Sequence, residues 1–194
     1  MLRLLRYLNS ILFGFREEIR SIRHALGLLG DEPVRKWASM VIATGMAQDK
    51  PSELVVSCLI RARFCELLSA PIGLSSRSTD LFLMGLLSLM DAILDRPMAS
   101  ILDSIPVSPD IKAGLLGEEG IFHHAHRLVL ACEGVDWDAL VDIAAKLRLS
   151  EETVSEGYFK SLEWSSQVPL SRSKSGAGLV VPAGGLSDVW SFFP

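Results

Sequence analysis

Three of the four histidines lie within one short stretch, and they are the side chains best suited to binding a metal ion. His123, His124 and His126 occupy positions i, i+1 and i+3 of a predicted helix. Two histidines of one helix share an ion most readily at i and i+4, as in the HExxH pattern, so only His123 and His126 could converge. The nearby carboxylates are not spaced to supply an obvious third ligand; they are Glu118, Glu119 and Glu133. We therefore expect no metal.

Other catalytic groups are equally hard to assemble from the sequence. It contains no GxxxxGK pattern followed by Ser or Thr to bind phosphates, and no GxSxG turn to present a nucleophilic serine. Cys58, Cys65 and Cys132 are too few and too scattered for a disulfide framework, so we expect small buried thiols in a reducing compartment. The sequence thus predicts no catalytic residues and no cofactor.

Charge is unevenly distributed along the 194 residues. The formal net charge is −4, yet residues 1–36 carry 7 Lys and Arg against 4 Asp and Glu, whereas residues 37–170 carry 10 against 18. The overall acidity disfavours nucleic acid as a partner. The basic N-terminal segment offers a candidate protein-binding surface, with ordinary solvated surface as the alternative; its arginines are Arg3, Arg6, Arg16, Arg20 and Arg23.

The most apolar stretch, Leu81–Leu94, predicts a buried central helix rather than a membrane span. Its 14 residues are nearly all apolar, but a bilayer needs about 20, and Asp91 lies inside the run. Thr79 is the expected N-cap and Pro97 follows the end. The N-terminus mixes charges into apolar sequence, which argues against a signal peptide. We expect a cytoplasmic protein that does not bind membranes.

Helical periodicity surrounds this stretch, and the fold class it predicts is all-α. Apolar residues recur at three- and four-residue steps before and after it, without sustained two-residue alternation. Residues 73–78 read as a polar loop, and a helix is expected over 118–133 with Ile121 facing inward. The expected helix-starting residues are Pro51, Ser108, Asp136 and Ser150, and Gly117 is an expected stop. We expect a compact multi-helix bundle around the central helix.

The chain divides into two regions in this interpretation. Residues 1–168 form the helical domain, and residues 169–194 form a Ser/Gly/Pro-rich tail in which helical periodicity is lost. Most of the tail is expected to be disordered. Its apolar end, residues 189–193, is expected either to fray or to dock on the domain or a partner.

Several separated motifs resemble the HDOD domain. The opening of this chain resembles the opening signature of that family, which is a leucine-rich helix followed by a set of characteristic positions. Those positions are occupied here by Asn9, Ser10, Phe13, Gly14, Ser21, Ile22, Leu29 and Gly30. The stretches 61–71, 80–94 and 105–120 resemble the HDOD half of YuxH-type bacterial signalling proteins, in which it follows an EAL domain. The resemblance covers about residues 1–165 and implies a helical fold related to HD metal-dependent phosphohydrolases but lacking their metal.

The metal-binding pair of the HD enzymes is replaced in this sequence. Where the related pattern reads GLLHD, this chain has Gly85-Leu86-Leu87-Ser88-Leu89, so Ser88 and Leu89 stand at the degenerate HD position. Leucine cannot bind a metal, and serine binds one weakly. The resemblance therefore implies a non-catalytic signalling and protein-interaction module. The alternative is a degenerate phosphohydrolase that uses His123, His126 and a nearby carboxylate.

The resemblance also implies what the module would act on. Its EAL neighbour in the family hydrolyses cyclic di-GMP, so an EAL-type phosphodiesterase is the expected partner, alongside a homo-oligomer. HDOD domains usually have a helix before the one that opens this chain. A free-standing module, a fragment of a longer protein and an internal start therefore all remain open.

Overall fold

The computed structural model describes the chain continuously from residue 51 to residue 168. It also describes residues 32, 35, 36, 39, 40, 43, 47 and 50, and the backbone of two short strands in the tail. The family-signature residues, the basic arginine surface and the apolar end of the tail lie outside the described residues. Those predictions, and the domain boundary at 168, stay predictions.

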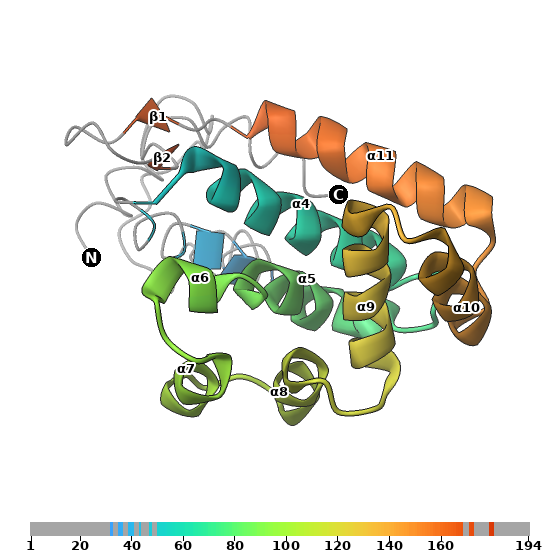
Figure 1. The fold of residues 1–194 in the computed structure, drawn as a ribbon, viewed down its shortest axis with the longest axis horizontal. Helices are drawn as coiled ribbons and strands as arrows, with labels where there is room; N and C mark the ends of the chain where they lie inside the picture. The colour runs from blue at the N-terminus through green and yellow to red at the C-terminus, as the bar shows by residue number, and fades with distance from the viewer. Residues whose placement is uncertain are drawn as a thin grey trace, which may run out of the picture.

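The described part is a bundle of α-helices, which confirms the all-α prediction (Figure 1). It holds α4 (Ser52–Leu68), α5 (Ser78–Leu87), α6 (Met90–Leu94), α7 (Met98–Ser104), α8 (Pro109–Leu116), α9 (Ile121–Gly134), α10 (Trp137–Leu147) and α11 (Glu151–Gln167), with a 3-10 helix, η2 (Ser75–Arg77). In the tail, β1 (Ser171–Arg172) pairs antiparallel with β2 (Leu179–Val180). No helix within the described ranges is long and apolar enough to cross a membrane.

Helix α4 runs through the middle of the bundle, between α11 on one side and α5 on the other (Figure 1). Side chains around most of its circumference are buried, including Val55, Leu59 and Phe64. Because an α-helix with an apolar surface on nearly all sides is stable only when other helices cover it, α4 is the element that the bundle encloses. Cys58 and Cys65 are buried on it, as expected.

The stretch expected to form one central helix is two helices. Residues 81–94 are divided between α5 and α6, and the break falls at Ser88 and Leu89. The Ser88 hydroxyl donates to the carbonyl oxygen of Gly85 at 2.7 Å, and the Ser88 N–H bonds to the same oxygen at 3.3 Å. This tightens the last turn of α5, and Leu89 then leaves the helical conformation with φ −118° and ψ 14°.

Two predicted helix caps are confirmed, and three other predictions about this part of the chain are corrected. Asp136 Oδ1 accepts from the Ala139 N–H at 3.0 Å, and Ser150 Oγ accepts from the Thr153 N–H at 3.2 Å, as predicted. Helix α5 begins at Ser78, so Thr79 is buried inside it rather than capping it. Residues 73–78, expected to form a polar loop, include the 3-10 helix η2 where the chain turns between α4 and α5. Helix α9 starts at Ile121, whose side chain is exposed rather than inward-facing.

Candidate functional site

The close crossing of α4 and α5 positions the degenerate HD pair. A Cβ atom on Gly85 would lie 2.4 Å from the backbone oxygen of Arg61 and 2.7 Å from the Cα of Ala62. Only glycine leaves the two backbones room to approach so closely. One turn after Gly85, this crossing brings Ser88 beside the Arg61 side chain.

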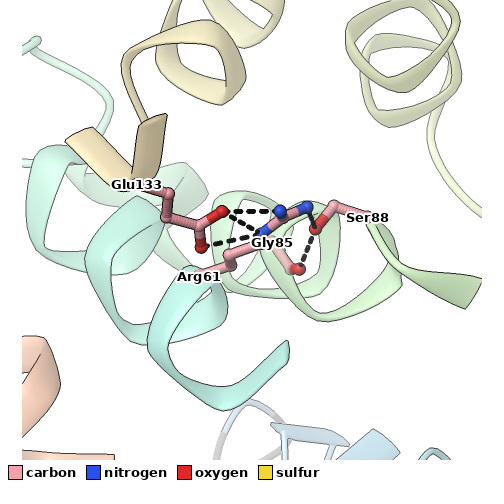
Figure 2. Close-up of polar contacts among 4 residues, drawn as sticks. All are labelled: Arg61, Gly85, Ser88 and Glu133. Carbon is pink, nitrogen blue, oxygen red and sulfur yellow. Dashed lines mark hydrogen bonds and ion pairs between the residues drawn. The ribbon is translucent and has the colours of Figure 1, made fainter. Parts of the chain in front are cut away.

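Arg61 joins three helices through its guanidinium group (Figure 2). Its Nε donates to Glu133 Oε1 at 2.9 Å, and its Nη2 donates to Glu133 Oε2 at 2.6 Å, so the pair with α9 is bidentate. Its Nη1 donates to Ser88 Oγ at 3.2 Å, and that hydroxyl donates to the Gly85 carbonyl. Both charged side chains are largely enclosed, with 12% of Arg61 and 24% of Glu133 exposed. A cation from the protein itself therefore contacts Ser88.

Leu89, the second residue of the degenerate pair, packs with apolar side chains. It is half-buried against the hydrophobic cluster that includes Phe82, Leu86 and Met90. An isobutyl group in this setting contributes packing and supplies no ligand or proton-transfer group. Neither residue of the pair thus carries metal chemistry.

The histidine stretch does not converge on a third ligand. His123 Nδ1 lies 3.4 Å from the carbonyl oxygen of Gly114, and His124 Nε2 lies 2.9 Å from Glu119 Oε1. Between residues 51 and 168, and at the described positions before them, no group of three His, Cys, Asp or Glu side chains could hold a metal ion. The geometry expected for the alternative enzyme site, His123 and His126 with a nearby carboxylate, is not assembled there.

His126 faces inward from α9, and its protonation is disfavoured. Its Nε2 atom is buried and has no hydrogen-bond partner among the described residues. Burial lowers the pKa of His126 to about 4, and the positive charge of Arg61 acts in the same direction, while a hydrogen bond with the Gly114 backbone opposes it. The imidazole is therefore neutral in the folded domain at neutral pH.

This burial predicts a specific loss of stability in acid. In the unfolded chain the His126 pKa is about 6.5, so between pH 6.5 and pH 4 the unfolded state binds a proton that the folded state does not. The free energy of unfolding is then expected to fall as pH drops through this window, by about 3 kcal/mol in total. Above pH 6.5 the contribution is fully present. Urea denaturation at several pH values measures it.

The matched control for this pH dependence is His126→Gln. Glutamine keeps a polar side chain at the position but does not titrate, so the variant should lose less stability between pH 6.5 and pH 4 than the wild type does. His124→Gln, at a neighbouring histidine whose Nε2 lies beside Glu119 instead of being buried without a partner, should behave like the wild type. Parallel curves for the wild type and His126→Gln would show that His126 is not the group responsible.

The remaining buried ionisable groups are not activated for chemistry. Burial raises the pKa of Cys58 and Cys65 to about 12 and that of Cys132 to about 11, so all three stay protonated thiols at neutral pH.

Glu66 accepts from Arg63 Nη1 at 2.7 Å and also pairs with Lys36. This second buried ion network ties the described part of the segment before α4 to α4 itself.

The sequence interpretation identified Ser88, but it missed the contact with Arg61, the close helix crossing at Gly85 and the ion pair with Glu133. One available signal was position: Arg61 lies three residues after Cys58, and so falls next to the buried stripe of α4. A charged residue at such a place must find a partner inside the fold. The identity of that partner depends on α9 packing beside α4, and no local pattern encodes this.

Comparison with known proteins finds one matching family model. The family model of the HDOD domain matches residues 1–94. The match includes α4, α5 and α6, so Arg61 and the Ser88–Leu89 pair lie inside the matched residues. Glu133 and the three clustered histidines lie beyond them. No solved structure matches the chain.

Two curated bacterial proteins are similar over most of this chain. Cyclic di-GMP phosphodiesterase CdgJ of Vibrio cholerae is 28% identical over 166 residues, which is 86% of this chain and 38% of that protein. The uncharacterized protein YuxH of Bacillus subtilis is 28% identical over 164 residues, 83% of this chain and 39% of YuxH. The chain thus spans about two fifths of the length of these relatives, and the similarity runs well past residue 94.

Proposed function

We propose that this HDOD domain is a non-catalytic regulatory module of cyclic di-GMP signalling, which acts through contacts with an EAL-type phosphodiesterase. The observation that carries the proposal is the contact between Ser88 and Arg61. Where an HD enzyme needs a histidine and an aspartate, this chain has a hydroxyl and an isobutyl group, and the hydroxyl is bonded to a guanidinium. The Ser88 hydroxyl already donates to the Gly85 carbonyl and accepts from the Arg61 guanidinium, so it is poorly placed to bind a divalent cation.

The similarity to a cyclic di-GMP phosphodiesterase supports the signalling context. Because this chain covers 38% of CdgJ, the catalytic activity in that protein's name does not have to reside in the part that is shared. The largely enclosed Arg61–Glu133 ion pair links α4 to α9, so a partner that moves one of these helices would also move the other. In our proposal, hydrolysis belongs to the partner.

The experiment compares the chain alone with the chain plus a phosphodiesterase. Purified chain should turn over no cyclic di-GMP in the presence of Mg²⁺ or Mn²⁺. Added to the EAL-type phosphodiesterases encoded in the same genome, it should change the hydrolysis rate of one of them severalfold. An immunoblot of source cells shows whether the partner is on the same polypeptide, since the chain itself has a mass of 21.2 kDa.

Two results would contradict the proposal. Hydrolysis by the chain alone, with tightly bound metal and with activity lost in His126→Ala, would favour the degenerate phosphohydrolase. An unchanged hydrolysis rate for every EAL-type phosphodiesterase tested, whether supplied separately or on the same polypeptide, would remove the regulatory role.

A further inference from the structure

Helix α10 has apolar residues on two faces, although only one of them is packed. Its inward face is buried against the rest of the domain and consists of Leu140, Ile143, Ala144 and Leu147. Trp137 and Val141 are exposed, with 67% and 54% of their surface accessible. These two residues are one helical turn apart, so they are neighbours in a single row. An exposed tryptophan in such a row is typical of a binding surface.

Val135 is a further exposed apolar residue, at the turn between α9 and α10. It is 62% exposed and adopts a left-handed backbone conformation with φ 54°. Glycine or asparagine would adopt this conformation at lower cost, whereas a β-branched side chain is strained in it. An exposed valine in this conformation stabilises neither the turn nor the hydrophobic core. It does add apolar surface next to Trp137.

The charges around this row decide what can bind there. Asp138 and Asp142 are both exposed and form the adjacent row of α10. From residue 136 to residue 167, the α10–α11 segment carries seven carboxylates and three basic side chains. Two copies of such a face would repel one another, and an anionic membrane would be repelled in the same way. A basic apolar ligand is attracted.

We propose that the α10 surface, formed by Val135, Trp137, Val141, Asp138 and Asp142, binds a basic amphipathic helix of a partner protein. The partner's apolar stripe would cover Trp137 and Val141. Its Lys or Arg residues would pair with Asp138, and at Asp142 they would compete with Lys146, whose Nζ lies 2.9 Å from Asp142 Oδ2. In Figure 1, α10 lies at the edge of the bundle, beside α9. The proposal rests on the proposed function in that it names the kind of partner.

The test measures binding of a defined peptide to the full chain. A fluorescein-labelled peptide about 18 residues long, with leucines at helical spacing and lysines elsewhere, is titrated by fluorescence anisotropy. A second peptide replaces every lysine with glutamate. The basic peptide should bind saturably and more weakly at high salt, and the acidic peptide should not bind.

Three variants locate the peptide. Trp137→Ser should weaken binding at least about tenfold. The double variant Asp138→Asn/Asp142→Asn keeps side-chain shape and should reduce both the affinity and its salt dependence. Ile121→Ser is the matched control. Ile121 is also exposed, but it begins α9, about 20 Å along the helix axis from Val135, so the variant should bind like the wild type. Circular dichroism confirms that each variant is folded.

Four binding results would overturn the proposal. These are equal binding of the acidic peptide, unchanged binding by both α10 variants, binding of anionic vesicles that requires Trp137, and absence of binding by the basic peptide. Self-association that Trp137→Ser abolishes would assign the surface to a second copy instead. The readout involves no cyclic di-GMP turnover. Peptide binding on α10 together with unaltered phosphodiesterases would therefore leave this surface in place while removing the proposed function.

Discussion

Replacing Gly85 with alanine is expected to lower the free energy of unfolding by about 3 kcal/mol. The added Cβ would lie 2.4 Å from the Arg61 carbonyl oxygen and 2.7 Å from the Ala62 Cα, and all of these are backbone positions in the buried centre of the bundle. A flexible side chain could rotate away, but α4 and α5 can only separate. The better helix propensity of alanine, worth about 1 kcal/mol, offsets a small part of the cost.

Separation of α4 and α5 would also move Ser88 away from Arg61, so the effect should extend beyond stability. Urea denaturation measures the free energy, and the control is Gly134→Ala at the exposed end of α9. A Cβ on Gly134 would meet nothing within 4 Å, so that variant should be neutral or slightly stabilised. If the two variants unfolded at the same urea concentration, the close crossing would not constrain residue 85.

Much of the architecture could be predicted from the sequence because helix periodicity and helix caps are local. Asp136 and Ser150 cap their helices as expected, since each needs only a side-chain oxygen three residues before a free N–H. The break between α5 and α6 is a different case. The apolar run continues through Ser88 and Leu89, and periodicity carries no sign that the Ser88 hydroxyl would bond to Gly85 and end the helix.

The candidate site could be predicted only in part, because its contacts join distant residues. Arg61 and Glu133 are 72 positions apart, and Lys36 and Glu66 are 30 apart. The charge of each was evident in the sequence, whereas its burial follows from the packing of whole helices. The exposure of Trp137 was equally non-local. An apolar residue on a helix is expected inside until the neighbouring helices are known to cover only the opposite face.

Replacing Arg61 with leucine is expected to cost about 2 kcal/mol and to leave Glu133 without its bidentate partner. The cost lies between that of a surface pair and a fully buried pair, because Glu133 keeps 24% of its side-chain surface accessible. Removing both charges in Arg61→Leu/Glu133→Leu should recover most of the loss, since neither group is then buried alone. Urea denaturation of the two single variants and the double variant gives the coupling free energy.

A second measurement tests whether Arg61 also acts on the pKa of His126. The charge of Arg61 contributes to lowering the His126 pKa, so the imidazole pKa should move upward from about 4 in Arg61→Leu. Glu133→Gln, which keeps the guanidinium, should leave the His126 pKa low. NMR titration of the His126 ring protons reports the shift directly. A pKa that stays the same in Arg61→Leu would mean that burial alone keeps His126 neutral, and Arg61 would then be a purely structural link between α4, α5 and α9.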